Sequence, residues 1–249
     1  MFNPYFSSMK LGLISAMHGR SELTAMWAEH TSQFGIPVYA AITDGDYDNL
    51  ETAWKYKFEW KVMPNNPVGD KFQAALTMAM QDGCDVVMRL PSDDFISKEW
   101  VAMFELKASL GADYFIPERI AVHDPSKGTY SIRANVGSRF MKYGAGACFS
   151  RKAVEKCGGL WTGHLDSGLD TESNNRLRTA GYECEAVPTK DIALVDIKTG
   201  ESIWPWGIWS FGEPACSDDE ALHMLSPSMR QTLSTNNTPT LAPVASELK

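Results

Sequence analysis

Two patterns of apolar and polar residues follow each other along the first half of the chain: short apolar runs and segments with helical spacing. Short apolar runs typical of buried strands cover 10–15, 38–43, 58–63 and 85–90. The clearest helix covers 70–82, where apolar residues recur at i, i+3, i+4, i+7 and i+8 and Gly83 follows. Strands that alternate with amphipathic helices predict an α/β fold: a Rossmann-like, mostly parallel sheet flanked by helices, in a single domain.

The second half of the chain differs from the first in composition and in the length of its predicted elements. Small residues occupy 144–147, and the spacing predicts short helices over 150–157 and 169–180. After about Leu225 the chain is rich in Ser, Thr, Asn and Pro, which bury little apolar surface, so we expect a frayed tail. We therefore predict one domain over 1–215, with halves at about 10–95 and 96–215, and a polar, partly disordered extension over 216–249.

Composition and charge exclude several classes of protein. The 249 residues are 44% hydrophobic and 22% charged, as in ordinary globular proteins, with a net charge of −8 that argues against a nucleic-acid coat. Between 133 and 156, however, the sign reverses, with six basic residues and one acid: Arg133, Arg139, Lys142, Arg151, Lys152, Lys156 and Glu155. A phosphate-bearing ligand or a solvated helix face explains this basic segment equally well.

Cellular location follows from what the chain lacks. No apolar run approaches the about 20 residues that span a bilayer, and the first ten residues do not have the pattern of a signal peptide. The five cysteines are scattered without the spacing of a zinc or redox site. We expect a cytoplasmic protein with reduced thiols and no transmembrane segment.

Polar residues follow the predicted strands and should gather at one edge of the sheet. Ser15, Asp44 and Asp93 come at or just after strand ends, where parallel sheets bind ligands. The adjacent carboxylates of Asp93 and Asp94 fit a hard divalent cation that carries nucleotide phosphates, although a turn and helix cap explain them as well.

Three further charged residues have a functional and a structural interpretation. Arg20 and Lys71 lie near helix starts and either neutralise a diphosphate or are solvated charges. Asp170 begins the predicted helix 169–180, where the helix dipole stabilises a carboxylate. Such a carboxylate is suited to take a proton from a hydroxyl, but it is also a common residue at a helix N-terminus.

The order of these motifs resembles the inverting family 2 glycosyltransferases with the GT-A fold. The resemblance covers about 10–190 and rests on Asp-Gly after the second strand, Gly-x-Lys at 69–71, Ser-Asp-Asp at 92–94, Phe-Ser-Arg at 149–151, Gly-Gly-Leu-Trp at 158–161, an acid six residues before Arg176, and Ala-Gly-Tyr at 180–182. It implies a nucleotide-sugar donor, with UDP favoured, and inversion at the anomeric carbon.

The resemblance also implies a role for each matching position. Donor-binding residues would be Ser15, Ala16, His18, Arg20, Asp44, Lys71, Ser92 and Asp93. Asp93 and Asp94 would hold Mn²⁺ or Mg²⁺ on the diphosphate, and Asp170 would be the general base. The half over 10–95 would bind the nucleotide sugar and the half over 96–215 the acceptor.

The chain departs from the family pattern at two positions. Pro91 replaces the first acid of the Asp-x-Asp motif, which leaves metal dependence open, and Leu169 replaces the Glu of the Glu-Asp pair. If Asp170 is displaced, Glu172 or Asp166 is the alternative base.

The acceptor and two rival functions stay open at this point. The acceptor is a saccharide or glycoconjugate, or a hydroxymethylated base in DNA. The rivals are a nucleotidyltransferase and a non-catalytic sugar- or nucleic-acid-binding module. The remaining candidates each have a functional and a structural interpretation. One of three histidines could be a third metal ligand, or all three could be packing or surface residues: His123, His164 and His223. Three tryptophans could stack on a sugar or base, or could seal the core: Trp204, Trp206 and Trp209.

Overall fold

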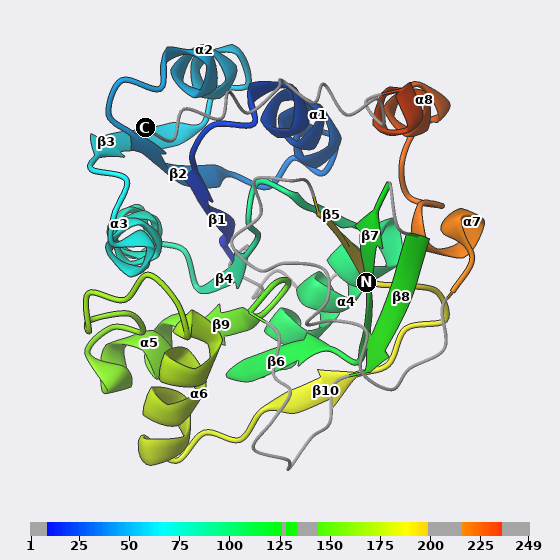
Figure 1. Cartoon of the computed structure of the whole chain (residues 1–249). Coiled ribbons are helices and arrows are strands. Elements are labelled where there is room, and N and C mark those ends of the chain that lie inside the picture. Colours follow the sequence, from blue (N-terminus) through cyan, green and yellow to red (C-terminus); the bar gives the residue numbers. More distant parts are fainter. Residues whose placement is uncertain (1–8, 126–127, 134–143, 199–215, 236–249) are drawn as a thin grey trace, which may run out of the picture.

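The computed structural model describes residues 9–125, 128–133, 144–198 and 216–235. A seven-stranded sheet forms its centre, in the order β10-β6-β9-β4-β1-β2-β3 (Figure 1). Its strands are β1 (Leu11–Met17), β2 (Val38–Thr43), β3 (Glu59–Met63), β4 (Val86–Arg89), β6 (Tyr114–Pro117), β9 (Cys148–Ser150) and β10 (Glu185–Val187). All neighbouring pairs are parallel except those of β9, which runs antiparallel to β4 and β6. The α/β class with a mostly parallel, helix-flanked sheet is therefore confirmed.

A second, four-stranded sheet was not predicted. It has the order β5-β11-β7-β8, built from β5 (Asp94–Ile96), β11 (Leu194–Ile197), β7 (Arg119–Asp124) and β8 (Gly128–Arg133). β4 and β5 follow each other directly in the chain but belong to different sheets. The connection over 90–93 therefore joins the two sheets.

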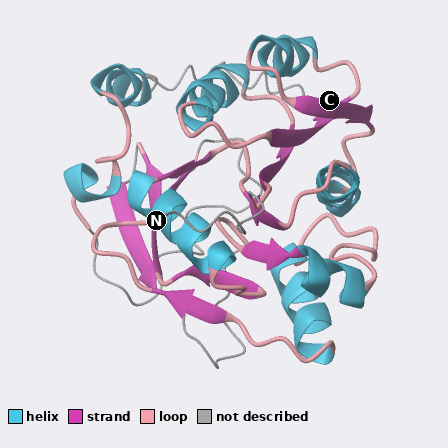
Figure 2. Cartoon of the chain, turned by 180° about the vertical axis from the view of Figure 1, so that it is seen from behind, coloured by secondary structure: helices cyan, strands magenta, loops and turns pink. Residues whose placement is uncertain are grey.

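Helices cover both faces of the central sheet (Figure 2). They are α1 (Ser21–Ser32), α2 (Tyr47–Lys55), α3 (Val68–Gln81), α4 (Lys98–Ser109), α5 (Arg151–Cys157), α6 (Leu169–Thr179), α7 (Asp218–Ala221) and α8 (Pro227–Thr235). Successive residues of a strand point to opposite faces, so Leu13 belongs to the core cluster that includes residues of α1, α2 and α4, whereas Ile14 belongs to the cluster that includes residues of α3, α5 and α6. None of the helices in the described part of the chain is long and apolar enough to cross a bilayer.

Local chemistry begins and ends several of these helices as the sequence predicts. Ser97 caps α4 by accepting a hydrogen bond from the backbone N–H of Trp100 at 3.0 Å. Gly158 follows α5 in the left-handed region, with φ at 65°, where glycine carries no side-chain penalty. The predicted strand 85–90 and helix 70–82 correspond to β4 and α3 with shifts of one or two residues.

Order in the C-terminal part continues further than its composition predicts. The expectation of fraying from about Leu225 is wrong for α8, whose Met229 and Leu233 are buried in the same core cluster as α1 and β1. Two apolar residues four positions apart are enough to hold one face of this otherwise polar helix on the core. Residues 236–249 lie outside the described residues.

Removal of the Leu233 side chain tests whether α8 packs as described. Leu233→Ala is expected to lower the free energy of unfolding by about 2–3 kcal/mol, because it deletes a buried side chain that is 6% exposed. Urea denaturation measures the change, with the exposed neighbour Ser234→Ala as control, expected within about 0.5 kcal/mol of the parent. Equal stability of both variants would contradict the packing of α8.

Candidate functional site

Three loops meet at the carboxyl edge of the central sheet. β1 lies between β2 and β4 and is parallel to both, so the loops after these strands, 18–20, 44–46 and 90–93, leave the sheet at the same edge. These loops carry most of the site residues expected from the sequence. We refer to this edge as the rim.

An ion pair joins the first and third of these loops. The Arg20 Nη1 lies 2.6 Å from the Asp93 Oδ2, and the two side chains are 18% and 13% exposed. Arg20 itself adopts a left-handed backbone conformation, with φ at 48°, directly before α1. This uncommon conformation for a non-glycine residue sets the start of α1 beside the loop of Asp93.

Lys71 and Asp46 join the loops after β1 and β2. From the buried side of α3, the Lys71 Nζ donates to the Met17 carbonyl at 2.7 Å and to the Thr43 Oγ1 at 2.8 Å. Asp46 caps α2 and accepts a hydrogen bond from the Gly19 backbone N–H at 2.8 Å. Burial lowers the pKa of Lys71 to about 8, and the nearby Arg20 acts in the same direction, whereas Asp46 raises it.

The remaining donor-side residues differ in how they reach the rim. Asp44 and His18 are exposed on their loops, and Ala16 is half-buried. The expectation that Ser15 follows the strand is wrong, because β1 continues to Met17 and Ser15 is fully buried within it. Ser92 is also buried, at 1% exposure. The strand that was predicted to end at Ser15 continues through Ala16 to Met17, whose apolar side chain is fully buried.

Two charged residues that the sequence analysis missed lie beside Asp93 and Asp94. Asp196 on β11 is directly opposite Asp94 on β5, and its Oδ2 pairs with the Lys198 Nζ at 2.6 Å. Burial, reinforced by the neighbouring acids, raises the pKa of Asp94 well above its ordinary value and that of Asp196 to about 6. The signal in the sequence was a single carboxylate inside the apolar run 192–197, outside the region of family resemblance.

The chemistry of these acids fits a divalent cation whose coordination is completed by oxygens of a bound ligand. The Oδ1 atoms of Asp94 and Asp196 are buried and have no hydrogen-bond partner among the described residues. Mg²⁺ is commonly held by one or two carboxylates together with substrate phosphates, rather than by the protein alone. In the described ranges no three acid, histidine or cysteine side chains converge to hold a metal by themselves.

The three histidines considered as a further metal ligand have local partners. His123 Nδ1 lies 2.7 Å from the Thr129 Oγ1, His164 Nδ1 lies 2.9 Å from a carboxylate oxygen of Asp70, and His223 Nδ1 lies 2.8 Å from the Glu220 carbonyl. The structural alternative accounts for each of them.

Asp170 is held on the rim by an arginine that the sequence analysis also missed. Its Oδ1 forms an ion pair with the Nη1 of Arg89, the last residue of β4. The Arg89 guanidinium is 10% exposed and stacks on two aromatic rings, with its carbon 4.5 Å from the Phe72 ring centre and 5.7 Å from that of Trp161. The Asp170 side chain is 42% exposed.

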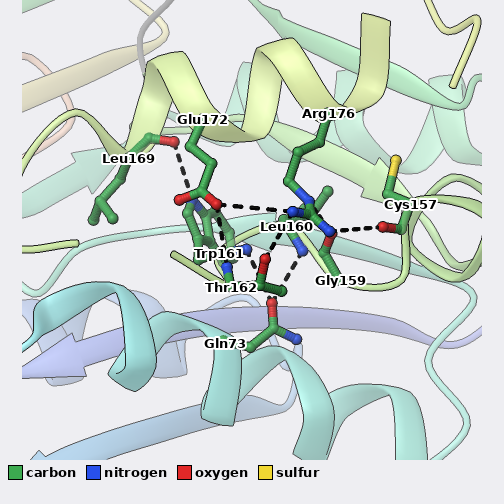
Figure 3. A network of polar contacts seen from close by, with 9 residues as sticks. All are labelled: Gln73, Cys157, Gly159, Leu160, Trp161, Thr162, Leu169, Glu172 and Arg176. Atoms are coloured by element: carbon green, nitrogen blue, oxygen red, sulfur yellow. Dashed lines mark hydrogen bonds and ion pairs between the residues drawn. The ribbon is translucent and has the colours of Figure 1, made fainter. Parts of the chain in front are cut away.

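The two alternative bases accept hydrogen bonds from nearby backbone, and Figure 3 shows Glu172 among these contacts. The Glu172 Oε1 accepts a hydrogen bond from the Thr162 N–H at 3.3 Å, and the Asp166 Oδ1 accepts one from the Val68 N–H at 3.1 Å. Arg176 donates to the carbonyls of Gly159 and Cys157, both at 2.9 Å. Asp170, the acid six residues before Arg176, therefore differs from Glu172 on the same helix. Asp170 pairs with Arg89, whereas Glu172 contacts the loop that contains Thr162.

The basic residues in the described part of the segment 133–156 contact nearby groups, and Lys152 and Lys156 both lie over the Tyr182 ring. Arg151 donates to the carbonyls of Met80 and Cys84, and Lys152 pairs with Asp113 at 2.9 Å. The side chains of Arg133, Arg139 and Lys142 lie outside the described residues, as do the tryptophans at 204–209.

Comparisons with known proteins give a likeness of fold. No family model matches the chain, and no curated protein matches it in sequence. It is similar to a proposed nucleotide-diphospho-sugar transferase from Desulfovibrio desulfuricans G20, with 13% identity and a TM-score of 0.47 over 92% of this chain and 98% of that chain.

Two nucleotidyltransferase structures are similar to a comparable degree. One is a proposed glucose-1-phosphate thymidylyltransferase from Bacillus anthracis in complex with sucrose, with 12% identity and a TM-score of 0.48 over 74% of this chain and 87% of that chain. The other is a cytidylyltransferase from Leptospira borgpetersenii, with 15% identity and a TM-score of 0.45 over 73% of this chain and 77% of that chain. Similarity at this level does not indicate an activity for this chain.

The lowered pKa of Lys71 predicts how stability depends on pH. The unfolded chain, with a lysine pKa of 10.5, binds the proton more tightly than the folded protein, with about 8. Stability from this group therefore rises as the pH increases from 8 to 10.5. Between pH 7.5 and 9.5 the parent is expected to gain roughly 1–2 kcal/mol relative to Lys71→Met.

Urea denaturation at both pH values measures this gain. Lys61→Met, which removes an exposed lysine from β3, is the reference for the loss of a positive charge. A constant difference in unfolding free energy between the parent and Lys71→Met across this range would contradict the burial of a charged Lys71.

Proposed function

We propose that the protein is an inverting glycosyltransferase that moves a sugar from a nucleoside diphosphate to an acceptor hydroxyl. One observation carries the proposal: β4 and the loop after it bear two carboxylate–arginine pairs, Arg89–Asp170 and Arg20–Asp93. Arg89 and Asp93 are four residues apart, so their Cα atoms are separated by at most about 14 Å. The two pairs therefore lie on one short stretch of chain at the rim, where a single nucleoside diphosphate sugar would reach both.

The donor would bind at the loops after β1, β2 and β4. Arg20 and Lys71 supply positive charge toward a diphosphate, and Lys71 uses two of its three N–H groups on Met17 and Thr43. Exposed Asp44 and His18 border the same loops and would contact the base or ribose of a UDP-sugar. Ser15 and Ser92 are buried and would form the floor beneath this site.

The acids beside the donor diphosphate would hold a divalent cation. Asp94 and Asp196, with Asp93 adjacent, would supply its protein oxygens, because two of their buried oxygens have no partner in the described part of the chain. Mg²⁺ or Mn²⁺ bound there would offset the negative charge that grows on the leaving diphosphate. Arg20 acts on the same charge from the protein side.

Asp170 would act as the general base. One of its oxygens is held by Arg89, and the side chain is exposed enough to meet an acceptor hydroxyl. The Asp170 carboxylate takes the hydroxyl proton as the acceptor oxygen bonds to the anomeric carbon. The bond from that carbon to the diphosphate oxygen breaks on the opposite face, and the nucleoside diphosphate leaves with its electron pair. The configuration at the anomeric carbon inverts.

The acceptor is proposed by class. A saccharide or glycoconjugate hydroxyl suits an open rim, and the hydroxymethyl group of a modified DNA base presents the same chemistry. Acceptor binding that weakens with salt, at a log–log slope of about −0.9 per phosphate neutralised, would identify DNA.

A panel of nucleotide sugars tests the proposed activity. The protein with Mg²⁺ or Mn²⁺ is expected to release UDP from a UDP-sugar, slowly with water and faster with acceptor. Product analysis by NMR is expected to give the inverted anomer. Release of pyrophosphate from a nucleoside triphosphate and a sugar 1-phosphate would identify a nucleotidyltransferase instead, and saturable binding without turnover would identify a binding module.

Substitution of Asp170 tests the assignment of the base. Asp170→Asn is expected to lower kcat by about 10²–10⁴-fold and to leave the donor KM nearly unchanged, since the amide cannot take the proton. Asp166→Asn in the same region is the matched control, expected to keep most activity because its oxygen still accepts from Val68. Near-normal turnover by Asp170→Asn would remove Asp170 from this role.

A further inference from the structure

Resting on the proposed function, we infer that Arg89 is a positioning residue that orients the base Asp170, and that Gly144 is the position that leaves room for this pair. No motif of the family resemblance includes Arg89.

Arg89 is held rigidly before it meets Asp170. Its backbone N–H donates to the Ala147 carbonyl, and its carbonyl accepts from the Gly146 N–H, both at 2.8 Å. The guanidinium is stacked on Phe72 and Trp161 and is nearly buried. Its Nε has no hydrogen-bond partner among the described residues, so the Asp170 carboxylate is its polar side-chain partner there.

The first turn of α6 is tied to the same aromatic ring. Trp161 Nε1 donates to the carbonyl of Leu169, the residue directly before Asp170, at 3.1 Å (Figure 3). The backbone N–H groups of Leu160 and Trp161 both donate to the Gln73 Oε1 at 3.0 Å, which connects this loop to α3. Trp161 therefore contacts both the arginine and the helix that bears the acid.

Gly144 lies directly against the ion pair. A Cβ atom at this position would overlap the Arg89 Nη1 and the Asp170 Oδ1. Any other residue would therefore require these two side chains or the backbone at 144 to shift. The chain at 144 thus covers the paired oxygen of Asp170.

These contacts leave one oxygen of Asp170, the Oδ2, to take the proton from the acceptor. Oδ1 is engaged by Arg89 and covered at Gly144, whereas no partner is assigned to Oδ2 within the described residues. A general base must lie within hydrogen-bond reach of the proton it takes, and displacement by about 1 Å can cost on the order of 10²-fold in rate. Arg89 restricts the side-chain torsions of Asp170 and so sets where Oδ2 faces the acceptor.

A double-mutant cycle tests this inference. Arg89→Met is expected to lower kcat by about 10- to 100-fold with little change in donor KM, and Arg89→Lys to recover part of the loss. In an Asp170→Asn background, Arg89→Met is expected to cause no further loss, because a positioning residue acts through the group it positions. Gly144→Ala is expected to cause a similar loss of kcat, because its methyl group would disturb the same ion pair. This variant tests the inference if Arg89→Met folds poorly.

Arg176→Met is the matched control, since Arg176 on the same helix also makes several polar contacts, none of those described being with Asp170. Its loss should be the same factor in both backgrounds, and denaturation curves establish that each variant is folded at the assay temperature. An unchanged kcat in Arg89→Met, or the same loss in the Asp170→Asn background, overturns the inference alone. An Asp170→Asn enzyme with normal turnover overturns the base assignment and this inference together, and failure of the parent to turn over any nucleotide sugar overturns the proposed function.

Discussion

The guanidinium of Arg89 is a full positive charge at the end of a buried strand, stacked against aromatic rings and almost out of reach of water. A charge in such a place must have a partner of opposite sign, because desolvation without one is unfavourable by several kcal/mol. Asp170 supplies that partner from a helix 81 residues later in the chain. The position of α6, the loop over 158–168 and the backbone at Gly144 all depend on this requirement.

The same constraint operates at the other end of the rim with a different result. Arg20 balances Asp93, and Lys198 balances Asp196, but Asp94 and Asp196 each retain a buried oxygen without a partner in the described ranges. The buried arginine beside the proposed base thus has a carboxylate partner, whereas two buried carboxyl oxygens beside the proposed donor site have no hydrogen-bond partner in the described ranges. These two oxygens are the part of the rim that would accept a cation.

Periodicity was sufficient to predict the regular elements of the central sheet, because strands such as β4 and helices such as α3 have one continuous apolar pattern. The second sheet was not predictable in this way. β5 has three residues and pairs with β11 about one hundred residues later, and no local pattern encodes such a pairing. The same difference separates the site residues. Arg20, Lys71 and Asp93 lie beside turns or helix starts that are recognisable in the sequence. Arg89 and Asp196 belong to apolar strands, and their role depends on partners that are distant in the chain.

The connection over 90–93 joins the two sheets and bears Asp93. A ligand that binds this acid only in the folded protein adds its binding free energy to the stability of the fold. At a ligand concentration one hundred times Kd this addition is about 2.7 kcal/mol, a substantial share of the stability of a typical domain. The supply of the ligand in the cell would then determine how long the folded protein survives as well as how fast it works.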